Sequence, residues 1–102
     1  MDDEAAVDET KVRDNAVERR FELPIDAQHA AFVEYRLMDD VIIFTHAETP
    51  PQFEGRGYGS MLAKGALDSV RDRGLKVIPH CSFIAAYIRR HPEYRDLLPT
   101  QH

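Results

Sequence analysis

The chain has little cysteine and no long apolar run. Cys81 is its single cysteine, so an internal disulfide cannot form, which is typical of a reducing compartment. No apolar run approaches the length of a membrane-spanning helix, and the opening Met-Asp-Asp-Glu is not the start of a signal peptide. We therefore expect a cytoplasmic protein that does not bind a membrane. The absence of a basic stripe argues against nucleic acid as a partner.

The charge is unevenly placed. The 102 residues carry a net charge of −5, and residues 1–18 account for all of it, with seven acidic and two basic residues. This segment lacks aromatic residues, leucine and isoleucine, so it cannot bury enough apolar area to offset its ordering entropy. We expect residues 1–18 to form a disordered acidic tail and residues 19–102 to form one domain.

Periodicity predicts four strands and two helices in that domain. Strands are expected at residues 19–23, 30–38, 41–48 and 75–79, with the first near an edge and a two-residue turn at Asp39-Asp40. Helices are expected from about residue 58 to Gly74 and over residues 83–90, with one more turn at residues 94–98. Strict alternation would place Ile42, Phe44, His46 and Glu48 on one face. The fold class is therefore α/β: a mixed, mostly antiparallel sheet with one βαβ crossover over residues 41–79.

A glycine-rich loop separates the third strand from the first helix. Gly55, Gly57 and Gly59 stand at alternate positions directly before an amphipathic helical run. Backbone N–H groups at the start of a helix, at the positive end of its dipole, suit phosphate. The alternative is a tight strand-to-helix turn that binds nothing. No Gly-Lys-Ser or Gly-Lys-Thr follows, so the loop is not a nucleoside-triphosphate P-loop.

Two stretches carry a resemblance to a known family. Residues 45–49 (Thr-His-Ala-Glu-Thr) followed by residues 55–60 (Gly-Arg-Gly-Tyr-Gly-Ser) resemble motif A of the GNAT superfamily of N-acetyltransferases. Residues 74–79 (Gly-Leu-Lys-Val-Ile-Pro), Cys81, residues 87–94 (Tyr-Ile-Arg-Arg-His-Pro-Glu-Tyr) and Leu97 resemble the small YjdJ-type branch of that superfamily. The resemblance covers roughly residues 20–98. It implies a single-domain, minimal GNAT-like fold.

The resemblance implies acetyl-coenzyme A as acyl donor and no metal. The pantetheine would run along the strand end formed by His46, Ala47, Glu48 and Thr49. The loop amides that would hold the pyrophosphate belong to Phe53, Glu54, Gly55, Arg56, Gly57, Tyr58, Gly59 and Ser60. Glu54 departs from the family pattern, which has Gln or Arg there. We expect Glu54 to turn outward, with Arg56 and Lys64 supplying positive charge.

Four side chains are candidates for catalysis, and each has a purely structural alternative. Cys81, just before a helix start, could contact the thioester, accept the acetyl group or donate a proton, or it could be a small buried hydrophobe. His46 and Glu48 could relay a proton from an amine, or they could be polar residues at a strand end. Tyr87 could protonate the leaving thiolate, or it could be a core aromatic. The histidines and Cys81 lack the paired spacing of a zinc site.

The resulting function is an acetyl-coenzyme-A-binding, N-acetyltransferase-like protein that transfers an acetyl group to an unidentified amine. The alternative is a non-catalytic coenzyme A or acyl-coenzyme A binding module, or a regulatory one. Only about five residues join the first two expected strands, where larger members of the superfamily carry two helices that build the acceptor pocket. We therefore expect an acceptor site, for a small molecule or a protein, that is shallow or shared with a partner subunit, in a monomer or a homodimer.

Overall fold

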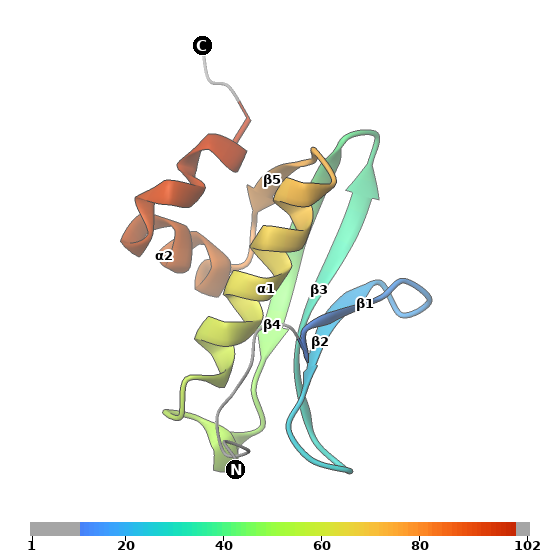
Figure 1. Cartoon of the computed structure of the whole chain (residues 1–102), viewed down its shortest axis with the longest axis vertical. Helices are drawn as coiled ribbons and strands as arrows, with labels where there is room; N and C mark the ends of the chain where they lie inside the picture. Colours follow the sequence, from blue (N-terminus) through green and yellow to red (C-terminus); the bar gives the residue numbers. More distant parts are fainter. Residues whose placement is uncertain (1–10, 100–102) are drawn as a thin grey trace.

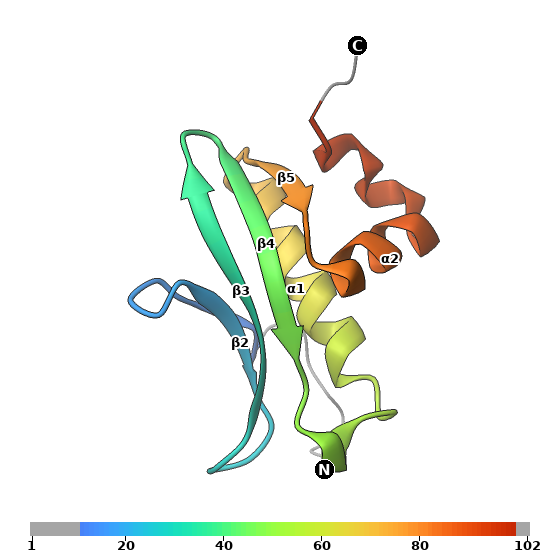
Figure 2. The ribbon, with the colours of Figure 1, turned by 180° about the vertical axis from the view of Figure 1, so that it is seen from behind.

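A computed structural model describes residues 11–99 of the chain. Its centre is a five-stranded sheet in the order β1-β2-β3-β4-β5, with α1 across one face and α2 beside the β4–β5 end of the sheet (Figures 1 and 2). The strands β1 to β4 are antiparallel to their neighbours, and β5 runs parallel to β4. The helix α1 makes the crossover between β4 and β5, so the expected α/β fold with one βαβ unit is confirmed. The elements are β1 (Arg13–Asn15), β2 (Arg20–Pro24), β3 (Ala30–Met38), β4 (Val41–Glu48), η2 (Pro51–Phe53), α1 (Tyr58–Asp72), β5 (Lys76–Pro79), α2 (Ser82–Arg90) and η3 (Pro92–Leu97).

The core lies between α1, α2 and one face of the sheet. Alternate residues of the strands point into it, among them Phe21 of β2, Val33 of β3 and Phe44 of β4, each at most 1% exposed. The helix α1 contributes an apolar stripe at helical spacing, which includes Leu62 and Leu67. The opposite face of the sheet carries no helix (Figure 2), which is why β3 alternates between buried and half-buried positions.

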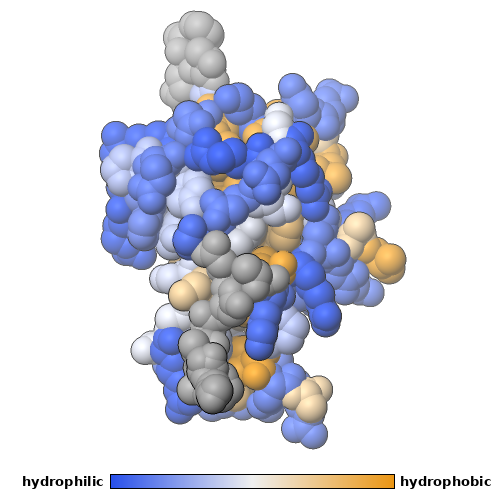
Figure 3. Space-filling model, in the orientation of Figure 1, coloured by the Kyte–Doolittle hydropathy of each residue, from blue (hydrophilic) through white to orange (hydrophobic). Residues whose placement is uncertain are grey.

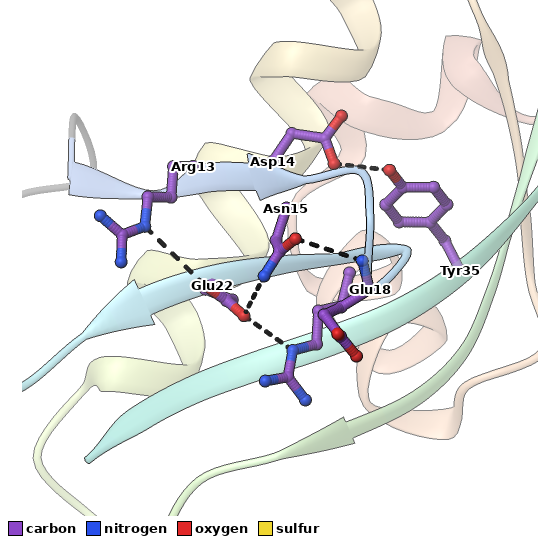
Figure 4. A network of polar contacts seen from close by, with 7 residues as sticks. Arg13, Asp14, Asn15, Glu18, Glu22 and Tyr35 are labelled. Carbon is purple, nitrogen blue, oxygen red and sulfur yellow. Dashed lines mark hydrogen bonds and ion pairs between the residues drawn. The ribbon is translucent and has the colours of Figure 1, made fainter. Parts of the chain in front are cut away.

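The strand β1 corrects the expected extent of the acidic tail. Arg13–Asn15 pair with β2 although they bring no apolar side chain to the core. Polar contacts hold the strand instead (Figure 4): Asn15 donates to Glu22, and Tyr35 Oη donates to Asp14 Oδ1 at 2.5 Å. Residues 13–15 are therefore part of the folded domain, and residues 1–10 of the expected tail lie outside the described part of the chain.

A β-bulge at Thr45 shifts the alternation of β4. Tyr35 of β3 lies opposite Phe44, but Glu34 lies opposite His46, so Thr45 has no partner residue. After this point Ala47 packs against the core, while His46 and Glu48 are exposed on the helix-free face. The prediction that Ile42, Phe44, His46 and Glu48 share one face is therefore wrong beyond Phe44. The extra residue reverses the side to which every later side chain of the strand points.

Candidate functional site

A cavity of about 370 Å³ opens where β4 ends and α1 begins. Its walls come from the end of β4, the glycine loop, the first turn of α1 and one side chain of α2. The lining residues are Ala47, Glu48, Thr49, Phe53, Glu54, Gly55, Gly57, Gly59, Ser60, Leu62 and Phe83. The structure thus brings most of the predicted ligand-binding residues together. His46, Arg56, Tyr58, Cys81 and Tyr87 are not part of the lining.

The glycine loop leaves the N-terminus of α1 open toward this cavity. Gly55 and Gly57 have φ angles of 82° and 88°, in the left-handed region that glycine adopts without strain. Gly57 is the N-cap of α1, with no side-chain cap and no acidic residue in the first turn. Among the described residues, no side chain accepts a hydrogen bond from the first amides of the helix, which belong to Tyr58, Gly59 and Ser60. The positive end of a 15-residue helix therefore faces the cavity, and no described side chain caps it.

Gly59 has a steric role that the sequence did not reveal. A Cβ placed on it would lie 2.9 Å from Cζ of Phe83, so glycine allows α1 to approach the start of α2. Phe83 and Leu62 thereby form the apolar part of the cavity wall, and neither was predicted as a site residue. Their sequence signal was only helical periodicity, which marks core residues equally well.

The charges around the loop differ from the expected arrangement. Among the described residues, Glu48 and Glu54 are the only ionisable ones in the lining, and both are acidic. The Arg56 guanidinium lies over the Phe53 ring, 5.7 Å from its centroid, and Lys64 forms an ion pair with Asp68 at 3.2 Å. The expected positive charge from Arg56 and Lys64 is therefore absent from the lining, and Glu54 is present in it. Backbone N–H groups supply the anion-attracting potential of the site.

His46 and Glu48 form a hydrogen-bonded pair at the rim. His46 Nε2 lies 2.8 Å from Glu48 Oε2, and the two side chains are 53% and 60% exposed. The bulge at Thr45 turns both to the helix-free face, where the His46 ring approaches Phe32 with centroids 6.3 Å apart. Glu48 also lines the cavity, so it connects the cavity with this open face.

Residues 20–97 match the family profile of the GCN5-related N-acetyltransferases. The chain belongs to this family. It is 31% identical over 84 residues to protein NATD1 of Mus musculus, across 80% of this chain and 76% of that protein. NATD1 of Gallus gallus is 36% identical over 52 residues, which span 51% of this chain and 47% of that protein. The solution structure of a GCN5-like protein from Staphylococcus aureus superposes with a TM-score of 0.65 at 28% identity, across 83% of this chain and 85% of that chain.

Two of the four candidate catalytic residues of this GCN5-related chain are buried away from the cavity. Cys81 is 6% exposed and is the N-cap of α2, where its carbonyl accepts from the Ala85 N–H at 3.0 Å and its own N–H donates to Phe44 O at 2.9 Å. Tyr87 is 4% exposed and stacks on His91 with centroids 3.9 Å apart. Both environments fit the structural alternative better than a role in catalysis.

The grouping of metal-binding side chains and the length and apolarity of the helices are two further features of the described part of the GCN5-related domain. Within residues 11–99, no three or more histidine, cysteine or carboxylate side chains gather in a group that could hold a metal ion. None of the helices in the same range is both long enough and apolar enough to cross a membrane.

Proposed function

We propose that the protein binds acetyl-coenzyme A in this cavity and transfers the acetyl group to an amine. The observation that carries the proposal is the open N-terminus of α1 above the glycine loop, at Gly55, Gly57 and Gly59. A coenzyme A diphosphate needs several N–H donors within one concave surface, and this loop presents them beside an apolar wall.

The end of β4 supports a place for the pantetheine arm. Pairing of β4 with β5 ends at Phe44↔Pro79, and the next bond runs from Cys81 N–H to Phe44 O. In the described part of the chain, the residues of β4 after Thr45 therefore have a strand partner on the β3 side alone. The backbone N–H and C=O of Ala47 point away from β3, since His46 and Glu48 direct theirs to Glu34 and Phe32, and are available there to bind the amides of pantetheine or to polarise the thioester carbonyl.

The proposed reaction is direct attack of a neutral amine on the thioester carbon. A C–N bond forms, the C–S bond breaks, and the sulfur leaves as a thiolate. The amine proton passes to the His46–Glu48 pair, either directly or through water, and the thiolate is finally protonated by solvent. Glu48 is suited to this role because it belongs both to the cavity lining and to the open face from which an amine can approach.

A second function, binding without catalysis, is supported by the catalytic side chains and the acceptor pocket that the described part of the site lacks. Cys81 and Tyr87 do not line the cavity, and only residues 25–29 join β2 to β3, so no acceptor pocket is built there. These features favour a coenzyme A or acyl-coenzyme A binding module that regulates a partner without turnover. Under either function we assign the chain to the YjdJ-type branch on the pattern of residues 74–97. Its cytoplasmic location and the nature of the acceptor remain predictions.

Thermal unfolding with coenzyme A and acetyl-coenzyme A tests the ligand. A ligand at about 100 times its Kd stabilises the folded state by about 2.7 kcal/mol, which raises the Tm of a domain of this size by roughly 10 °C or more. Gly57→Asp should abolish the shift because a carboxylate would face the diphosphate. Gly74→Asp is the matched control: Gly74 also has a positive φ, 72°, but lies at the far end of α1. An unchanged Tm of the parent protein with either ligand would overturn the proposal.

Release of free coenzyme A thiol, measured with a panel of small amines and lysine peptides, separates the two functions. We expect turnover that falls at least tenfold in Glu48→Gln while the thermal shift is kept, because the proton acceptor is lost and the loop is not. A retained thermal shift without turnover on any acceptor would instead favour the binding module.

A further inference from the structure

The exposed apolar side chains gather at one edge of the sheet. Among the described residues, the large hydrophobic side chains that are exposed are Val17, Leu37 and Met38, at 89%, 53% and 61%. Val17 lies in the turn between β1 and β2, and the other two end β3 before the Asp39-Asp40 turn. Figure 3 shows apolar surface on the side of the molecule where these two hairpins project in Figure 1.

The end of β3 is also an unpaired strand edge. Pairing with β2 ends at Arg20↔Glu34, and the Tyr35 N–H then donates to Arg19 O at 3.0 Å. Met38 and Val41 flank the two-residue turn, so Met38 and Arg36 direct their amides to β4, and Leu37 directs its amide away from it. Such an edge invites a further strand, and this one has neither a proline nor a bulge to prevent pairing.

A cavity of about 570 Å³ lies beside this edge, between the two hairpins. Its lining consists of Ala16, Arg19, Tyr35, Arg36, Leu37, Met38 and Ile43. Within residues 11–99 the guanidinium groups of Arg19 and Arg36 have no hydrogen bond or ion pair, and neither do the carboxylates of Asp39 and Asp40. The edge therefore carries two free positive charges on one side of Leu37 and two free negative charges on the other.

We propose that this edge pairs with the same edge of a second copy of the chain. In an antiparallel pair centred on Leu37 and the partner's Leu37, the two residues exchange backbone hydrogen bonds, and Arg36 lies opposite the partner's Met38. Arg36 then lies diagonally from the partner's Asp40, which is within reach of a long side chain. The partner's turn falls beside Arg19 and enters the cavity, and the same contacts repeat about the two-fold axis.

The charge pattern selects a second copy over other strands. An acidic peptide would meet Asp39 and Asp40, and a basic peptide would meet Arg19 and Arg36. Only a strand with the same pattern, run in the opposite direction, places unlike charges together at both ends. Pairing would also cover Leu37 and Met38, which are otherwise exposed to water.

Sedimentation velocity over a concentration series tests the assembly. We expect the mass to rise from one chain to two between about 1 µM and about 1 mM, the range of weak association. Amide exchange tests the mode: the Leu37 N–H should become protected only at concentrations where the dimer forms. A constant single-chain mass over the whole range, or a dimer whose Leu37 amide exchanges as fast as in the monomer, would overturn the proposal.

Charge reversal tests the register. Arg36→Glu and Asp40→Arg should each weaken dimerisation at least tenfold, because each places like charges together twice, and the double variant should restore it. Arg89→Glu on the exposed end of α2 is the matched control and should leave the dimer unchanged. Loss of the dimer in the double variant, or its survival in both single variants, contradicts the proposed register. None of these residues lines the ligand cavity, so the result does not depend on the proposed enzymatic function.

Discussion

Glu54 is the residue whose chemistry most opposes the proposed ligand. It lines the cavity together with Glu48, and within residues 11–99 no cationic side chain lines it with them. A carboxylate near a diphosphate repels it, and the loop amides must offset this repulsion. The residue type that the family pattern has at this position, glutamine or arginine, would not impose that penalty.

Replacing Glu54 with glutamine should therefore tighten coenzyme A binding. We expect the Kd to fall by about fivefold at low ionic strength, and the gain to shrink as salt screens the repulsion. Isothermal titration calorimetry at two salt concentrations measures both effects. Glu93→Gln, an exposed glutamate of η3, is the control and should change neither. Unchanged binding in Glu54→Gln would mean that this carboxylate is directed away from the ligand, and weaker binding would mean that it contacts the ligand favourably.

Residue chemistry alone could not rank the candidate catalytic groups. Cys81 and Tyr87 have reactive side chains, but their spacing on the last helix is also that of core residues, and the structure buries both. His46 and Glu48 are exposed because an extra residue at Thr45 reverses the alternation. The bulge cannot be recognised in the sequence, because Ile42, Phe44, His46 and Glu48 stand at strictly alternate positions.

At the scale of elements, the junction of α1 and α2 depends on one missing side chain. Because Gly59 has no Cβ, the Phe83 ring can lie against the first turn of α1. A Cβ at this position would lie 2.9 Å from Cζ of the ring. This contact sets one wall of the ligand cavity.

Gly59→Ala should displace Phe83 and lower the free energy of unfolding. Overpacking of this kind costs about 1–3 kcal/mol, which denaturant titration measures directly. Phe83→Leu in the same chain should recover most of that loss, because the shorter side chain removes the clash. Additive losses in the double variant would show that the two residues do not share this contact.

The sequence predicted the strands that have one buried face, but it did not predict the strand that is held by polar contacts with distant residues. The strands β3 and β4 and the turn between them were predicted to the residue, because alternation and Asp39-Asp40 specify them. The strand β1 was missed because its three residues, Arg13–Asn15, are polar. Its partners Glu22 and Tyr35 lie at least seven positions away in the chain, beyond the reach of local pattern.

At the scale of the whole molecule, Asp14 connects three elements. It accepts a hydrogen bond from Tyr35 of β3 and forms an ion pair with Arg73, which follows α1, at 2.5 Å. Burial and the neighbouring Asp14 carboxylate raise the pKa of Tyr35 to about 12 from its ordinary value of 10. Since the folded state holds the proton more tightly, this group contributes stability below pH 10 that is lost as the pH rises toward 12.

The free energy of unfolding should accordingly fall between pH 10 and pH 12, the interval between the two pKa values of Tyr35. A pKa difference of this size corresponds to about 2–3 kcal/mol. Tyr35→Phe should be less stable than the parent protein at pH 8, by about 1 kcal/mol for the lost hydrogen bond, but should decline less steeply above pH 10. Urea titrations across this range give both slopes. Tyr58→Phe removes a hydroxyl that has no carboxylate partner among residues 11–99, so it should keep the parent slope. Parallel declines of Tyr35→Phe and the parent would contradict this assignment.

The unpaired Thr45 has a consequence for how relatives of this chain are compared. Deleting Thr45 would restore regular alternation and leave the faces unchanged: Ala47 would still point to the core, and His46 and Glu48 would still point to the helix-free face. A relative that keeps all eight residues of β4 but pairs them without a bulge would instead turn the residues at positions 46 and 48 toward α1. In an alignment, a strand without the bulge therefore carries a polar pair on the same surface only when it has a one-residue gap at position 45.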